Sequence, residues 1–255
     1  MIRLTPLLFS APALLLLFWI PTQEQNAWSV DDFDIADRVE RARALRGAIM
    51  RDRFSNAGLP YPPREIFLRV FKHEAELELW ARDDAARFQH IATWKILANS
   101  GQAGPKRREG DRQVPEGFYK IERFNPRSLY HLSLGLDYPN ASDRVRSDPQ
   151  RPGSDIFIHG GDRTIGCLPL GDDAIEELYL IALDTHVHQR NEIAVHIFPA
   201  RMSSPSWNDF VRINARGELN AFWEELRPGF EEFERERYVP RIEVDSSGRY
   251  RVLPR

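Results

Sequence analysis

A histidine and the only cysteine of the chain stand eight positions apart, at His159 and Cys167. The apolar run Ile156 to Ile158 is typical of a buried strand, and the glycines after His159 predict a turn that ends this strand and exposes the imidazole. Such a turn can bring the imidazole beside the thiol. Because a cysteine attacks as its thiolate, and a neighbouring imidazole both accepts the proton and lowers the thiol pKa, the pair predicts a nucleophile, Cys167, with His159 as its general base and acid.

The glycines around this pair favour catalysis over a purely structural role. A lone cysteine is more often a small buried residue, and a lone histidine is more often a hydrogen-bonded core residue. Gly160, Gly161 and Gly166, however, let the backbone approach a substrate closely. Gly166 stands where peptide N–H groups around Cys167 can point at a developing oxyanion, and we expect backbone oxyanion binding there.

The motif resembles that of a known family. His159-Gly160 followed by Thr164-Ile165-Gly166-Cys167-Leu168 is similar to the His-Gly…Ser/Thr-x-Gly-Cys-Ile/Leu signature of the L,D-transpeptidase (YkuD-type) catalytic domain of bacterial cell-wall enzymes. The segment 114–121 resembles a strand of that family. Gly104 to Lys106, Leu134 to Ala141 and Val195 to Pro199 resemble one subgroup, whose characterised members are periplasmic hydrolases that detach outer-membrane lipoprotein from peptidoglycan. The resemblance covers roughly residues 66–201.

The resemblance implies a mainly β fold with flanking helices, in which an L,D-transpeptidase-type β-sandwich or barrel core carries helical extensions at both ends. It implies acyl transfer through a thioester on Cys167, with a backbone carbonyl of Gly160 or Gly161 orienting the ring of His159. The implied partners are peptidoglycan stem peptides, which can carry covalently bound outer-membrane lipoprotein. We expect neither a cofactor nor a metal.

The acyl acceptor decides the activity. If water accepts, the enzyme hydrolyses the diaminopimelate–lipoprotein amide or a related L,D amide; if an amine accepts, it is a transpeptidase that forms crosslinks or attaches lipoprotein. Crosslinking members usually carry arginine two positions after the cysteine, where this chain has Pro169, and losing that guanidinium removes a charge-assisted contact. Hydrolysis is therefore favoured. A noncatalytic peptidoglycan-binding module is the alternative, although a pure binder has no need of a thiol.

Five further residues are expected to bind substrate. Lys106, Arg144 and Arg163 could supply the charge that Pro169 lacks, although a solvated surface role is open for each of them. Tyr138 and Thr164 complete the set.

Two further histidines, His131 and His196, are predicted to be structural. His131 is expected in a strand with a cross-strand hydrogen bond, and His196 alternates with apolar neighbours. His186 and His188 lie near the end of a predicted helix, where side chains two positions apart do not share a face, so their spacing does not suit zinc.

The first 27 residues are expected to be a targeting segment rather than part of the folded domain. Arg3 precedes an uncharged apolar run, Leu4 to Ile20, as in a signal sequence or signal anchor, and whether it is cleaved stays open. We expect export to the periplasm or cell envelope, with membrane contact only through that anchor. A single cysteine has no intramolecular disulfide partner in an oxidising compartment, so chemistry explains it more easily. The net charge of −3 gives no argument for nucleic acid.

Hydrophobic patterning divides the rest of the chain into three parts: an N-terminal helical segment (28–60), a catalytic domain (61–201) and a C-terminal helical and hairpin extension (202–255). The first should contain a helix over 30–56. Strands are predicted in the catalytic domain at 66–72, 76–81, 88–96, 118–124, 130–136, 156–158 and 192–198, with a helix from about 171 to 184. The polar loop 99–112 is expected to carry function or be mobile, and the loop 146–153 to be mobile.

Overall fold

The computed structural model describes residues 30–254 except 85 and 204. The expected export segment, residues 1–27, lies outside the described residues. Within the described part, no helix combines the length and the apolar character needed to cross a membrane.

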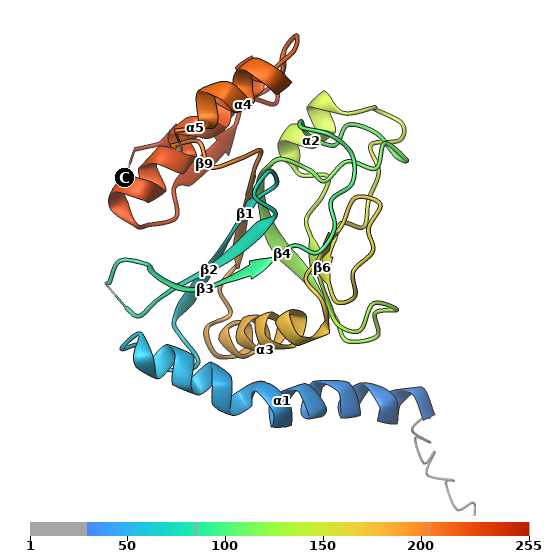
Figure 1. Ribbon diagram of the computed structural model, residues 1–255, viewed down its shortest axis with the longest axis vertical. Coiled ribbons are helices and arrows are strands. Elements are labelled where there is room, and N and C mark those ends of the chain that lie inside the picture. Colours follow the sequence, from blue (N-terminus) through green and yellow to red (C-terminus); the bar gives the residue numbers. More distant parts are fainter. Residues whose placement is uncertain (1–29, 85, 204, 255) are drawn as a thin grey trace, which may run out of the picture.

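The core is one curled eight-stranded sheet, a half-barrel, with the strand order β3-β2-β1-β8-β4-β5-β6-β7 (Figure 1). Neighbouring strands are antiparallel except for β1 with β8 and β6 with β7, which are parallel. This confirms a mainly β fold with flanking helices. The strands are β1 Glu65–Phe71, β2 Glu76–Arg82, β3 Gln89–Lys95, β4 Gly117–Asn125, β5 Ser133–Leu136, β6 Phe157–His159, β7 Leu168–Pro169 and β8 Ala194–Phe198.

Strand β1 shows why both faces of the sheet are covered. Its residues after Glu65 are all buried, and successive side chains point to opposite faces. Ile66, Leu68 and Val70 join the larger apolar core together with residues of α1 (Val30–Asn56) and α3 (Asp172–Gln189). Phe67 and Phe71 join the aromatic clusters on the other face.

The face of the sheet that carries Ile66, Leu68 and Val70 is covered by α3, and α1 lies across α3 on its outer side (Figure 1). Arg43 of α1 binds Asp184 of α3 at 2.8 Å, and Arg53 binds Glu177 at 2.9 Å. The opposite face is covered by the C-terminal extension, which consists of α4 (Trp207–Asn214), α5 (Leu219–Glu236) and the hairpin of β9 (Arg241–Val244) and β10 (Tyr250–Leu253).

Two predicted elements were wrong at their bounds, and one helix was not predicted. The strand expected from Tyr130 begins only at Ser133, because His131 has a positive φ of 71° that ends extended pairing. The segment after Tyr138 forms a short helix, α2 (Ala141–Arg146), which begins with a capping box between Asn140 and Asp143. The helix expected to end near residue 184 continues to Gln189.

Candidate active site

The pairing of β6 with β7 brings Cys167 beside the strand that ends in His159. In this parallel pair Ile158 lies opposite Leu168, and both side chains are buried in the core. Because side chains alternate along a strand, His159 is expected on the face opposite to Ile158. Cys167 comes directly before β7, one residue from the partner of Ile158.

The turn after His159 is held by the start of α3. Asp172 accepts a hydrogen bond from the Gly161 N–H at 2.8 Å, and the Gly171 N–H donates to the Gly161 carbonyl at 2.9 Å. A Cβ on Gly160 would lie 2.6 Å from Asp172 Oδ1 and 2.7 Å from the carbonyl oxygen of Tyr130. Glycine is therefore required after the histidine because no side chain fits between these oxygens.

His159 is oriented by its own turn. Its Nδ1 lies 2.5 Å from the carbonyl oxygen of Gly160. A carbonyl can only accept, so Nδ1 carries the proton and Nε2 keeps the lone pair that can take a proton from a thiol. The prediction that the turn exposes the imidazole was wrong, because the side chain is buried. Burial lowers the pKa of His159, and the bond to Gly160 partly offsets this. The resting imidazole is therefore neutral at neutral pH.

The Cys167 thiol also rests uncharged. Burial raises its pKa, while the Phe157 N–H, 3.4 Å from Sγ, acts in the opposite direction. The thiol donates weakly to the Asp155 carbonyl at 3.7 Å. Among the described residues the thiol contacts the backbone around β6 rather than His159 Nε2. For His159 to take this proton, the S–H would have to turn to the imidazole when a substrate binds, as catalytic hydrogen bonds often tighten only in the complex.

The Thr164 hydroxyl stabilises the turn that carries Cys167. Its hydroxyl donates to the Cys167 carbonyl at 2.7 Å and accepts from the Gly166 N–H at 3.1 Å. The oxyanion role predicted for Gly166 would require this second bond to break, or would fall to the N–H of Cys167 itself. Thr164 was predicted to bind substrate, but in the resting structure its hydroxyl is engaged within the turn.

The thiol opens into a cleft of about 710 Å³ whose far wall is made by two loops. These loops, 104–113 and 147–155, overlap the loop 99–112, which was expected to carry function or be mobile, and the loop 146–153, which was expected to be mobile. The two loops pair with each other. The Glu109 N–H donates to the Arg151 carbonyl, and the Asp148 N–H donates to the Arg107 carbonyl, both at 2.8 Å. Gly153 lies against the Lys106 side chain, where a Cβ would come within 2.7 Å of Lys106 Cε.

Of the five residues predicted to bind substrate, only Lys106 lines this cleft. It is buried, and its ammonium binds Asp111 at 2.6 Å and the Arg108 carbonyl at 2.9 Å. Arg144 lies exposed on α2, and Arg163 lies exposed in the turn after β6; neither lines the cleft.

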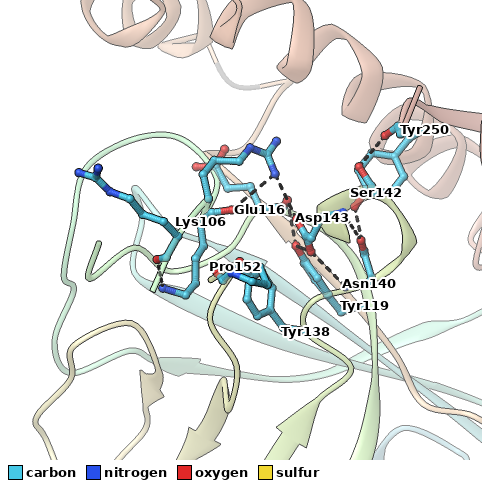
Figure 2. A network of polar contacts seen from close by, with 12 residues as sticks. Lys106, Glu116, Tyr119, Tyr138, Asn140, Ser142, Asp143, Pro152 and Tyr250 are labelled. Atoms are coloured by element: carbon cyan, nitrogen blue, oxygen red, sulfur yellow. Dashed lines mark hydrogen bonds and ion pairs between the residues drawn. The ribbon is translucent and has the colours of Figure 1, made fainter. Parts of the chain in front are cut away.

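Tyr138 is buried behind the cleft, and its hydroxyl donates to the Pro152 carbonyl at 2.9 Å (Figure 2). Pro152 itself lines the cleft. Tyr138 therefore contacts the cleft wall rather than the space inside it.

A polar network behind this wall joins the cleft loops to the C-terminal hairpin (Figure 2). Asp143 accepts from the Tyr119 hydroxyl at 2.9 Å and from Arg107 at 3.1 Å. The Asn140 amide donates to the Tyr250 hydroxyl at 2.8 Å. The hairpin thus stabilises the α2 segment on which the loop 104–113 rests.

The structure contradicts the prediction for His131 and agrees with the prediction for His196. His131 is not in a strand, and its Nε2 lies 2.9 Å from Glu176 of α3, so the cross-strand role was wrong. His196 is buried between the rings of Phe67 and Phe118, with centroids 4.6 and 4.7 Å away, as a structural residue would be. No group of three or more possible metal-binding side chains occurs in the described part of the chain.

Two site residues were missed in the sequence. The ring of Tyr130 lies beside that of His159, with centroids 4.8 Å apart. Arg112 lines the cleft near Cys167. The basic character of the loop 99–112 was the only sequence signal for Arg112. No sequence pattern marked Tyr130 as a site residue.

Comparisons with known proteins agree with this geometry. The family model described as YkuD, the L,D-transpeptidase catalytic domain, matches residues 68–188. The Escherichia coli (strain K12) protein named "Putative L,D-transpeptidase YafK" is 32% identical over 189 residues, which cover 73% of each chain. This chain belongs to the L,D-transpeptidase family. Members of this family act on peptidoglycan peptides, and the site described above lies within the matched residues.

Solved structures show weaker similarity. The helical cell shape determining protein Pgp2 from Campylobacter jejuni is 20% identical, with 73% of this chain and 74% of that chain covered and a TM-score of 0.43. Bd1075 from Bdellovibrio bacteriovorus is 24% identical, with 68% and 60% covered and a TM-score of 0.38. The membership of this chain in the L,D-transpeptidase family rests on the sequence matches alone.

Proposed function

We propose that this protein is a cysteine-dependent peptidoglycan hydrolase that cuts the amide joining diaminopimelate to a lipoprotein lysine, or a related L,D amide. The observation that carries the proposal is the orientation of His159. Its Nδ1 is bound to the Gly160 carbonyl, so Nε2 is left to accept the proton of the Cys167 thiol, which lies beside the same strand.

The chemistry follows from these two groups. Nε2 takes the thiol proton as Sγ attacks the amide carbonyl, and a tetrahedral oxyanion forms. The imidazolium then gives its proton to the departing amine, the C–N bond breaks, and a thioester remains on Cys167. Water, deprotonated by His159, attacks the thioester, and a carboxylate leaves as the thiol regains its proton.

Pro169 supports hydrolysis over crosslinking. It lies in β7 opposite His159, and its carbonyl accepts a hydrogen bond from the Leu97 N–H at 2.9 Å. No cation is supplied at this position for the carboxylate of an acceptor strand. The substrate class also agrees with the expected export by residues 1–27, and we propose that the enzyme works in the periplasm or cell envelope.

The test is mass spectrometry of peptidoglycan that carries covalently attached lipoprotein, after incubation with the protein and with its Cys167→Ala variant. Release of lipoprotein by the wild type alone is expected. New diaminopimelate–diaminopimelate dimers would assign crosslinking instead. If both proteins left the material unchanged, the proposed substrate would be wrong.

A further inference from the structure

We infer that Arg112 binds a carboxylate of the substrate in the cleft beside Cys167. The identity of the substrate, a peptidoglycan stem peptide, rests on the proposed function. The position of Arg112 in the cleft and its positive charge do not depend on the proposed function.

Two of the three cations that line the cleft are already neutralised. Lys106 is buried against Asp111, with Nζ 2.6 Å from Oδ1. Burial opposes ionisation of Asp111, but Lys106 and backbone N–H groups hold its pKa below the usual range, so this carboxylate stays charged. Arg151 is paired with Glu109 at 2.9 Å.

The third cation is Arg112. Asp155 is the other carboxylate of the cleft lining, and it is bound by Arg123 at 2.9 Å from outside the cleft. Among the described residues, no carboxylate lies within ion-pair distance of the Arg112 guanidinium. The cleft therefore presents one cationic side chain that is not neutralised by the protein.

The backbone holds Arg112 next to the nucleophile. The carbonyl oxygen of Gln113 lies 3.1 Å from the position that a Cβ on Gly166 would take, so segment 112–113 packs on the residue before Cys167. Asp111 fixes this segment because its carboxylate accepts hydrogen bonds from the Gln113 N–H at 3.0 Å and the Arg107 N–H at 2.8 Å.

Arg112 itself has a φ of 58°, in the left-handed region that glycine and asparagine occupy more easily than arginine. Asp111 holds this turn through its hydrogen bond from the Gln113 N–H, and the Arg112 side chain is exposed. A guanidinium presents paired N–H donors that match the two oxygens of a carboxylate, and this is the contact that Pro169 does not supply.

The test is direct binding, measured by calorimetry with the full-length chain carrying Cys167→Ala, so that the ligand is not consumed. The ligands are a synthetic stem tripeptide that ends in diaminopimelate, and the same peptide with its diaminopimelate carboxylates amidated. The parent protein should bind the acid about tenfold more tightly, as a hydrogen bond to a charged group predicts. Arg112→Asn, which tolerates the left-handed backbone, should bind both peptides equally, and Arg112→Lys should keep part of the preference.

Arg190→Asn is the matched control. Arg190 is also left-handed, with a φ of 53° at the end of α3, and it does not line the cleft, so this variant should keep the full preference. The inference is overturned if Arg112→Asn keeps the preference, or if the parent shows none or binds neither peptide. Lipoprotein release by the enzyme with Cys167 intact is measured in parallel. Absence of release would end the proposed function alone, while loss of the predicted preference with release intact would end this inference alone.

Discussion

The ring of Tyr130 lies 4.8 Å from the ring of His159, tilted by 39°, and this half-exposed tyrosine packs against the buried imidazole proposed as the base. The loop that carries Tyr130 is held from two directions. The Gly160 N–H donates to the Tyr130 carbonyl at 3.0 Å, and Arg38 of α1 donates to the carbonyls of Ser128 and His131 at 3.1 and 3.2 Å. The N-terminal helix therefore contributes to the position of the base.

Tyr130→Ala should lower kcat/KM for lipoprotein release by about three- to tenfold, because an aromatic pair contributes about 0.5–1.5 kcal/mol beyond burial. Tyr130→Phe keeps the ring and should retain most of the activity. Steady-state kinetics of both variants checks this. Equal activity of Tyr130→Ala and the wild type would show that the ring does not position His159.

Gly160→Ala should remove most activity and lower the free energy of unfolding by about 1–3 kcal/mol, because the new methyl group meets the backbone oxygen of Tyr130. The matched control is Gly47→Ala within α1, where the nearest atoms belong to the flexible Arg51 side chain. That change should be neutral or stabilising, since alanine favours helix. Urea unfolding measures both, and an equally stable Gly160→Ala protein would contradict the described turn.

Arg69 tests how the C-terminal extension is attached. This side chain is 1% exposed and binds Glu78 at 3.0 Å and Glu234 of α5 at 2.6 Å. Arg69→Ala should lower the free energy of unfolding, measured in urea, by about 3 kcal/mol. This is the lower end of the range for breaking a buried ion pair, because Arg201 still binds Glu78 at 2.7 Å. Arg69→Met, which fills the space with apolar atoms, should cost less. A loss below about 1 kcal/mol for alanine would show that the network does not stabilise the fold.

Asp143 predicts a pH dependence of stability. Burial raises its pKa from 3.8 to about 6, although Tyr119 and Arg107 favour the charged form. Between these values the folded chain keeps a proton that the unfolded chain has lost. The stability contributed by this group is therefore fully present below about pH 4 and is lost as pH rises to about 6, by up to about 3 kcal/mol.

Asp143→Asn should remove this contribution. Urea unfolding of both proteins at several pH values from 4 to 7 measures the difference between them. The comparison is needed because His196, whose pKa burial lowers to about 3, contributes a slope of opposite sign in this window. Parallel stability curves for wild type and variant would contradict the assigned pKa.

Local patterns predicted the elements because they depend on neighbouring residues alone. The mostly apolar run 66–72 and the spacing in α1 were sufficient to place both elements, and the motif at His159 and Cys167 was sufficient to predict the pair. The capping box of Asn140 and Asp143 was a readable signal for α2 that was not used.

Contacts between distant loops could not be predicted in this way. The burial of Lys106 against Asp111 depends on the loop 147–155, which packs over it, and the position of Tyr130 depends on the left-handed turn at His131. A cationic loop was visible in the sequence, but which of its cations would be left without a carboxylate partner was decided only by the fold.

The most direct test of the central claim, that His159 activates Cys167, is the rate of alkylation of the thiol by iodoacetamide as a function of pH. Since the chain has one cysteine, the reaction reports on Cys167 alone. His159→Ala should lower the rate near neutral pH, because only the thiolate reacts and its proton acceptor is gone. Unchanged alkylation kinetics across the pH range would show that the two residues are not coupled.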